Sequence, residues 1–284
     1  YASPDGAATG SATALLTAIS TPANWAGDDA VVPGAPSAFR VTAAVAATAL
    51  FQPAPSTAQG SSDASAAIAL DDDYMVVGDD EGNVLRVYPR GGGVAVKEWE
   101  FGSLLGISKE LDLEAATHIG DTWYFIGSHS NKSDGAEADN REHLFAAQVT
   151  GTGAATAFTF KGQYAGLEGA LAGWDTANAH GKGAGYFGMA ASAAGGVLPE
   201  GSNGFSIEGM AATSSGQLLL GMRAPLASMA LRRNALIVPI ANPAALMAGA
   251  TPVFGAPIEL NLGGRGIRDM QQTEDGQYLI MAGP

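Results

Sequence analysis

The stretch LDLEAATHIGDTWYFIGSHSNKSDGAEADNREHLF, residues 111–145, decides the fold. It opens on two carboxylates, Asp112 and Glu114, and passes through a polar turn into an apolar run at residues 123–126. A Gly-Ser-His-Ser corner, a polar loop and Arg141 follow before the chain becomes apolar again. A β-hairpin needs only turn residues between its strands. The additional polar residues at both ends therefore indicate a hairpin that also carries a functional site.

The same pattern recurs along the chain. A carboxylate, a few small residues, a polar turn and an apolar run appear again around Glu208 and around Asp269, and a degenerate copy follows Asp63. Successive starts lie roughly 50 to 90 residues apart, which suits propeller blades with loop insertions. The sequence therefore predicts an all-β fold, a β-propeller with four-stranded blades. The expected inner strands are the apolar runs at 123–126, 218–222 and 278–280.

The remaining segments complete this plan. Further strands are expected at 74–78, 83–88 and 94–101 in the first blade, at 144–149 and 157–161 in the second, and at 235–240 in the third. A fourth blade is expected to begin with 258–262. Asn242, Pro243 and Gly249 predict a short helix at 243–248, with an N-cap, a first-turn proline and a terminating glycine. Residues 61–284 are thus assigned to the blades.

Two segments fit the blade pattern less well. Residues 1–60 are rich in Ala, Thr, Ser and Pro, and we expect them to contribute loops and a closing strand. Residues 162–204 are rich in Gly and Ala and are expected to form an insertion or a weakly patterned blade. Their G-x-G-x-x-G match is no evidence for dinucleotide binding, because no strand and helix are evident around it.

The C-terminal end of the sequence bears on how the ring of blades closes. A propeller closes by pairing its last blade with its first, because an open ring leaves unpaired strand edges. Only residues 281–284 follow the last expected strand. Either the N-terminal segment closes a small ring, or a C-terminal piece is missing, cleaved or a separate chain. We favour the second alternative, an incomplete C-terminus.

Composition excludes some functions. The net charge of −14 and 14 basic against 28 acidic residues argue against nucleic-acid binding. No run of 18 apolar residues is present, so no membrane-spanning helix is expected. The chain has no cysteine, which removes disulfides and thiolate metal sites. Together with the Ala- and Gly-rich composition, this favours a secreted or periplasmic protein.

The recurring acids form the candidate site. Equivalent residues of successive blades converge on the channel, and converging carboxylates repel unless a cation or an arginine lies between them. One hypothesis is a metal site, with Ca²⁺ as the expected ion. The other is that the acids cap turns and pair with arginine. The candidate metal ligands are Asp112, Glu114, Glu208 and Asp269.

Arginines recur beside these acids. Arg141, Arg223 and Arg268 are candidate ligand-binding residues, because so few arginines placed next to carboxylates are unlike general surface decoration. They are either structural partners of the acids or a fork for a small anionic ligand. His129 is the candidate general base, although a lone histidine at a strand end is more often a hydrogen-bonded corner residue. Gly-Ser-His-Ser is not a nucleophile elbow, so a serine hydrolase is disfavoured.

Several motifs together carry a resemblance. D-L-E-A-A-T at 112–117, G-S-H-S at 127–130, I-E-G-M-A at 207–211, L-L-L-G-M-R-A-P at 218–225 and G-G-R-G-I-R-D-M at 263–270 resemble a bacterial β-propeller family of unknown function. That family is distantly similar to the esterase-like phytase propellers. The resemblance covers residues 61–283 and implies an exported propeller with the motif acids and arginines near the channel mouth.

Three functions are compatible with these observations. The leading hypothesis is an extracytoplasmic binding or scaffold domain with a polar, cation-binding channel. The alternative is a metal-assisted phosphoesterase, in which a calcium cluster and Arg223 and Arg268 hold the phosphate. A weaker hypothesis is a module that binds a protein partner. Whether the chain is an enzyme is left open between them.

Overall fold

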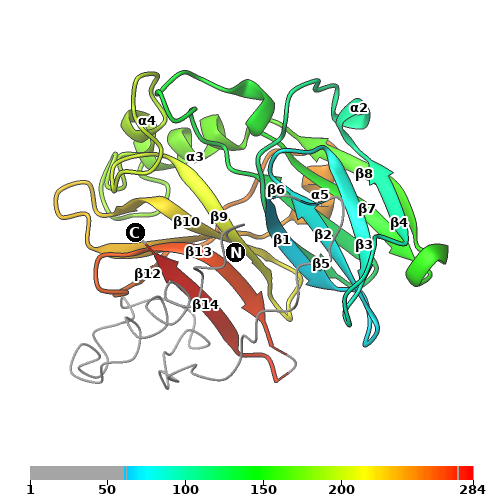
Figure 1. Cartoon of the computed structure of the whole chain (residues 1–284). Coiled ribbons are helices and arrows are strands. Elements are labelled where there is room, and N and C mark those ends of the chain that lie inside the picture. The colour runs from blue at the N-terminus through cyan, green and yellow to red at the C-terminus, as the bar shows by residue number, and fades with distance from the viewer. Residues whose placement is uncertain (1–60, 62, 274, 284) are drawn as a thin grey trace.

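A computed structural model describes residues 61, 63–273 and 275–283 of the chain (Figure 1). All sheets in these residues are antiparallel, and each follows the order of its strands in the sequence. The predicted all-β fold with four-stranded antiparallel sheets is confirmed. Residues 1–60, and with them the expected closing strand, lie outside the described residues.

The first sheet contains β1 (Ala64–Ala69), β2 (Tyr74–Asp79), β3 (Val84–Pro89) and β4 (Lys97–Glu100). The second contains β5 (Leu113–Ile119), β6 (Thr122–Gly127), β7 (Leu144–Thr150) and β8 (Ala157–Tyr164). The third contains β9 (Ser206–Ala212), β10 (Leu218–Ala227), β11 (Asn234–Ile240) and β12 (Ile258–Leu260). A final hairpin pairs β13 (Gly266–Gln272) with β14 (Tyr278–Gly283).

The first strands of the sheets lie next to one another in the middle of the molecule (Figure 1). β5 and β9 are joined by a hydrogen bond from the Ala212 N–H to Thr117 Oγ1, at 3.0 Å. β9 and β13 approach closely at Gly209, where a Cβ atom would lie only 2.8 Å from Ile267 Cγ2. β13 and β1 are joined by Gln271 Nε2, which donates to the Ala67 carbonyl at 3.1 Å. Adjoining first strands of successive meanders are the arrangement of propeller blades.

Two details of the predicted plan are wrong. The innermost strands are β5, β9 and β13, which carry the acids, and not the apolar runs at 123–126, 218–222 and 278–280 that follow them. The strand expected at 258–262 does not open a fourth blade, because β12 pairs with β11 and forms the outer edge of the third sheet. Both errors have one cause. An apolar run such as 123–126 or 218–222 marks a strand buried on both faces, and in the second and third sheets that strand is the second one, β6 or β10.

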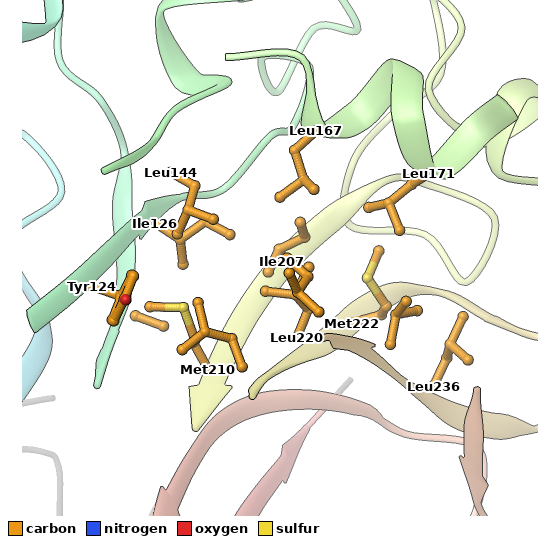
Figure 2. Packing of buried hydrophobic residues seen from close by; sticks show 14 of the residues in the cluster. Tyr124, Ile126, Leu144, Leu167, Leu171, Ile207, Met210, Leu220, Met222 and Leu236 are labelled. Carbon is orange, nitrogen blue, oxygen red and sulfur yellow. The ribbon is translucent and has the colours of Figure 1, made fainter. Parts of the chain in front are cut away.

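The apolar core lies between neighbouring sheets. Figure 2 shows the cluster between the second and third sheets, where Tyr124 and Ile126 face Ile207, Met210 and Leu220. A second cluster fills the space between the first and second sheets, and a third lies between the third sheet and the β13–β14 hairpin. Each sheet is therefore held against the next by buried side chains, at about 25 cal/mol per Å² of apolar surface removed from water.

Helices cover the ends of the sheets. The α-helices are α2 (Gly102–Leu105), α3 (Leu167–Thr176), α4 (Met189–Ser192) and α5 (Pro243–Met247), and the 3-10 turns are η3 (Asp139–Arg141) and η4 (Gly153–Ala155). α5 confirms the predicted helix, although Asn242 bonds to Thr251 and Val253 instead of capping it. Among the described residues, no helix has the length and apolar character needed to cross a membrane.

Most of the segment 162–204 forms helices and loops. β8 extends to Tyr164, and between β8 and β9 the described residues form α3, α4 and loops but no strand. α3 buries Leu167, Leu171 and Trp174 on one face, against the cluster of Figure 2. Their spacing of four and three residues is helical and was visible in the sequence. The Gly-rich motif leads only into the four-residue α4, without a preceding strand, so it has no Rossmann context.

Candidate ligand-binding site at the strand bulges

One β-bulge occurs at the same register in every first strand. In each sheet the first strand contains one extra residue opposite the second strand, just inside its N-terminal end. A bulge leaves the extra residue unpaired and re-aims its side chain, and bulges are frequent next to functional sites. Because the first strands adjoin, the four bulges form one region, which we call the bulge site. The extra residues are Ser65, Glu114, Glu208 and Arg268.

Glu208 is the carboxylate of the bulge site in which both oxygens have an arginine partner. It is buried, and its two oxygens bind different guanidinium groups: Arg223 Nη1 lies 2.8 Å from Oε1, and Arg268 Nε lies 2.8 Å from Oε2. Burial raises the pKa of the Glu208 carboxyl above its usual value, and the two arginines oppose that shift. The arginines of the third sheet and of the hairpin are thus structural partners of the acid, one of the two predicted roles.

A second ion pair stands at the start of β5. Arg141 Nη1 lies 2.9 Å from Asp112 Oδ2 and also donates to Ser130 Oγ at 3.2 Å. Asp112 has a φ of 59°, in the left-handed region that a non-glycine residue rarely adopts. Its carbonyl accepts the Ser128 N–H at 2.9 Å, which extends the β5–β6 ladder by one step. Strained backbone of this kind concentrates at functional positions.

Glu114 lies between these two ion pairs and belongs to neither. It is partly buried, and no hydrogen bond or ion pair to it is found among the described residues. Burial, followed by the charges of Glu208 and Asp112, raises the pKa of its carboxyl to about 9. Arg268 opposes this shift without cancelling it. Glu114 is therefore protonated at neutral pH unless a positive charge is brought to it.

Asp80 is a member of the site that the sequence did not predict. It follows β2, and its N–H donates to the Asp63 carbonyl at 3.1 Å, as Ser128 does to Asp112 in the second sheet. Burial and the neighbouring charges of Asp63, Asp112 and Asp79 raise the pKa of its carboxyl to about 6. The sequence 79–82 has the composition of a solvated hairpin tip. Only its position after the second strand of a repeat could have revealed its role.

Two predicted site residues lie apart from this group. Asp269 accepts a hydrogen bond from the Met270 N–H at 2.7 Å, and burial alone raises its pKa, with no acid or arginine of the bulge site contributing. His129 is 1% exposed, and its Nδ1 lies 2.8 Å from the Gly127 carbonyl oxygen. Burial lowers the pKa of the imidazole to about 4, so it is neutral at pH 7. The role of His129 as a general base stays a prediction.

The predicted metal site has no preformed geometry. Within the part of the chain that the structure describes, no group of three or more His, Asp or Glu side chains is arranged to hold a metal ion. Arginines stand between the converging acids instead. The Ca²⁺ hypothesis stays a prediction that this arrangement does not support on its own.

Several buried polar atoms around the site have no hydrogen-bond partner. Asp80 Oδ1, Arg141 Nε and Arg223 Nε are inaccessible to solvent and unpaired among the described residues. Of the other side-chain atoms in those residues, only His129 Nε2 and Ser192 Oγ share this condition, since Glu259 Oε1 lacks a hydrogen bond but lies 2.9 Å from Lys182 Nζ. Native proteins pair nearly all buried polar groups, and exceptions often indicate a missing water, ion or ligand. The bulge site thus combines unused donors with unused acceptors.

Sequence comparison identifies one family. Residues 195–284 match a family described as protein of unknown function (DUF3616). The match includes Glu208, Arg223 and Arg268 but not Glu114, so DUF3616 accounts for about a third of the chain. The resemblance to a family of unknown function is confirmed for these residues, and the similarity to phytase propellers stays untested. No curated protein matches the chain.

Structural comparison finds solved structures at low similarity, one of them described as a β-propeller domain. The β-propeller domain of Cps50 (Swd1) from Myceliophteria thermophila aligns with a TM-score of 0.33 and 9% identity, over 73% of this chain and 46% of that domain. The extracellular domain of a one-component system from B. thetaiotaomicron aligns with a TM-score of 0.30 and 13% identity, over 76% of this chain and 25% of that one. This chain therefore spans less than half of either structure. Its own strand order is the stronger basis for discussing the fold.

Proposed function

We propose that the protein is an exported β-propeller domain that binds a ligand with a cationic group at the bulge site. The observation that carries this proposal is the carboxyl of Glu114. It is flanked by Glu208, Asp112 and Asp80, it has no partner, and its pKa is raised to about 9. A positive charge placed there relieves the repulsion and restores the ionised form. Asp80 supplies a second unpaired carboxylate oxygen in the same region.

The arginines indicate which other groups the ligand carries. Arg141 and Arg223 each retain a buried Nε–H without an acceptor, although both guanidinium groups are also ion-paired. A buried donor left unpaired costs about 1 to 3 kcal/mol, which a ligand acceptor would recover. The ligand class is therefore a cation accompanied by acceptor groups. Hydrated Ca²⁺ and an organic ammonium compound are two sources of that chemistry.

Titration calorimetry with calcium chloride, and separately with the diamine putrescine, tests the proposal. We expect one of them to bind, and to bind more tightly at pH 8 than at pH 6, because the cation displaces protons from Glu114 and Asp80. Glu114→Gln should weaken that binding at least tenfold, about 1.4 kcal/mol. Asp121→Asn is the matched control, since it makes the same acid-to-amide change at the exposed far end of the β5–β6 hairpin. Equal binding by wild type and Glu114→Gln would reject Glu114 as the cation site.

The metal-assisted phosphoesterase has no observation of its own in its favour. Arg223 and Arg268, which would hold the phosphate, are both bound to Glu208. Hydrolysis of a generic phosphate ester by wild type, and its loss in both Glu208→Gln and Arg223→Ala with the fold intact, would revive the hypothesis. Export is supported by composition alone, and cell fractionation of the native producer is its test.

A further inference from the structure

A cavity of about 470 Å³ opens between two loops beside the second sheet. One wall is the link from α2 to β5, at residues 105–109, and the other is the loop from β6 to β7, at residues 137–140. His143, which directly precedes β7, completes the lining. Pockets for small organic molecules have volumes of about 300 to 1,000 Å³. Among the described residues, none that belongs to the bulge site lines this cavity, so it is a separate candidate site.

Asparagine side chains hold the two walls in place. Asn83 Nδ2 donates to the Lys109 carbonyl at 2.8 Å, and Asn83 Oδ1 accepts the Leu111 N–H at 2.9 Å. Asn140 Nδ2 donates to the Glu110 carbonyl, which joins one wall to the other. Because the walls are tied together, a ligand does not have to order the loops when it binds.

Hydrogen bonds fix the tautomer of His143. Gln163 Nε2 donates to the Leu105 carbonyl at 3.4 Å, which leaves Gln163 Oε1 to accept a hydrogen bond from His143 Nδ1 at 2.7 Å. The reverse orientation of the amide would bring its oxygen against the Leu105 carbonyl oxygen. Because burial lowers the pKa of the His143 imidazole, the ring is neutral at pH 7 and carries its single proton on Nδ1. Nε2 is then an unprotonated acceptor.

This acceptor is unused. His143 is 8% exposed, and no hydrogen bond to its Nε2 is found among the described residues. Unlike His129 Nε2, which is enclosed by protein, His143 Nε2 can be reached from the cavity. A ligand that donates to this atom supplies a hydrogen bond that the folded protein otherwise leaves unmade.

The remaining lining residues indicate the charge of the ligand. Glu137 and Asp139 are exposed carboxylates on one wall, and Lys109 is a cation on the other. Leu105 and Ile107 supply apolar contacts. A metal ion fits this lining less well, because no group of three or more His, Asp or Glu side chains in the described part of the chain is arranged to hold one.

Two further acids strengthen the negative field at the second wall. Burial, followed by the charges of Glu142, Glu137 and Asp139, raises the pKa of the Glu168 carboxyl to about 7. Burial and the charges of Asp139 and Glu137 also raise the pKa of Glu142. Such shifts require the acids to lie close together. The acids outnumber Lys109, so the cavity favours a ligand with a positive charge.

We propose that this cavity binds a small organic ammonium compound, which donates an N–H to His143 Nε2 and places its positive charge beside Glu137 and Asp139. The apolar part of the ligand packs against Leu105 and Ile107. Neither this site nor the bulge site depends on the other.

Titration calorimetry at pH 7 with benzylamine tests the proposal, since benzylamine combines an ammonium group with an apolar ring. We expect wild type to bind it, and to bind the uncharged benzyl alcohol about tenfold more weakly or worse. His143→Asn keeps a donor to Gln163 at the position of Nδ1 but removes Nε2, and should weaken benzylamine binding by about tenfold or more. His143→Gln keeps an acceptor at the position of Nε2 and should weaken it less. His118→Asn, at an exposed histidine near the β5–β6 turn, is the matched control and should change nothing.

Nitrogen-15 NMR of wild type tests the same site without a variant. Nε2 of His143 should be the unprotonated ring nitrogen at neutral pH, and its signal should shift when benzylamine is added. A proton on Nε2 in the free protein would overturn the proposal.

Three binding results would also overturn it. They are no binding of benzylamine by wild type, equal binding by wild type and His143→Asn, and equal binding of benzylamine and benzyl alcohol. Glu114→Gln should leave benzylamine binding unchanged, because Glu114 lies outside the cavity. Loss of benzylamine binding in Glu114→Gln but not in His143→Asn would assign the ammonium group to the bulge site instead.

Discussion

Asp175 in α3 and Glu114 in β5 are both shielded from water. They differ in that the described residues around them supply hydrogen-bond donors to Asp175 and none to Glu114. Asp175 is 1% exposed, and its Oδ1 accepts hydrogen bonds from His180 Nε2 and the Phe187 N–H, both at 3.0 Å. Its Oδ2 accepts from the Met189 N–H, also at 3.0 Å. Glu114 has no such partner and a pKa raised to about 9. A satisfied buried carboxylate holds an insertion together, whereas an unsatisfied one points to a binding role.

The position of the ring proton on His180 supports the structural role of Asp175. The Lys182 N–H donates to His180 Nδ1 at 3.1 Å, so the ring proton is on Nε2 and is donated to Asp175. The imidazole ring packs edge-on against both Trp174 and Phe187, which stack on each other. Every polar atom of the pair is thus engaged within the loop between β8 and β9, and none is left for a ligand.

The largest effect should come from removing Asp175. Asp175→Ala leaves the Phe187 and Met189 N–H groups and His180 Nε2 buried without acceptors, at about 1 to 3 kcal/mol each before relaxation. We expect a loss of about 3 kcal/mol in the free energy of unfolding, measured by urea denaturation. Asp175→Asn should lose less, because its amide oxygen still accepts. A loss below 0.5 kcal/mol in Asp175→Ala would contradict the structural role.

Glu208→Gln should be the next most damaging change. It leaves Arg223 and Arg268 close together without the carboxylate that both bind. Removing one partner from a buried pair typically costs 3 to 5 kcal/mol, and the partial exposure of both arginines reduces this to about 2 kcal/mol. Urea denaturation at low and high salt is the measurement. An unchanged free energy of unfolding would show that the arginines find other partners in the bulge site.

Glu114→Gln should act in the opposite direction. The folded-state pKa of Glu114 lies above that of the unfolded chain, so its favourable contribution is complete below about pH 4.5 and is lost as the pH rises to about 9. Glutamine does not ionise, so the variant does not lose this stability as the pH rises. The variant should match wild type near pH 4 and be more stable by at least about 1 kcal/mol at pH 8, a rise of at least about 2 °C in melting temperature. Equal melting temperatures at both pH values would show that Glu114 is not perturbed.

The contrast between these carboxylates also shows what the sequence reveals. Recurring acids beside arginines predicted Asp112, Glu114, Glu208, Arg141, Arg223 and Arg268, which the structure brings together. Asp269 was grouped with them by sequence spacing, but its carboxylate accepts a hydrogen bond from the Met270 N–H, and no acid or arginine of the bulge site shifts its pKa. Asp80 was missed because a hairpin tip rich in acids looks solvated. Bulges depend on pairing between strands, so a single sequence carries no direct signal for them.

The smallest effect is expected at a surface ion pair of similar length. Arg86 Nε lies 2.9 Å from Glu98 Oε1, the same distance that separates Arg141 and Asp112, but the Glu98 side chain is 61% exposed. Exposed pairs contribute about 0 to 1 kcal/mol, because water and salt screen the charges. Without Glu98, Arg86 would still have Asp79 as an ion-pair partner, because its Nη1 lies 3.8 Å from Asp79 Oδ2. Glu98→Gln should therefore change the free energy of unfolding by less than 0.5 kcal/mol in urea denaturation. A loss as large as that of Glu208→Gln would mean that the distance between charges, and not their burial, decides the energy of ion pairs in this fold.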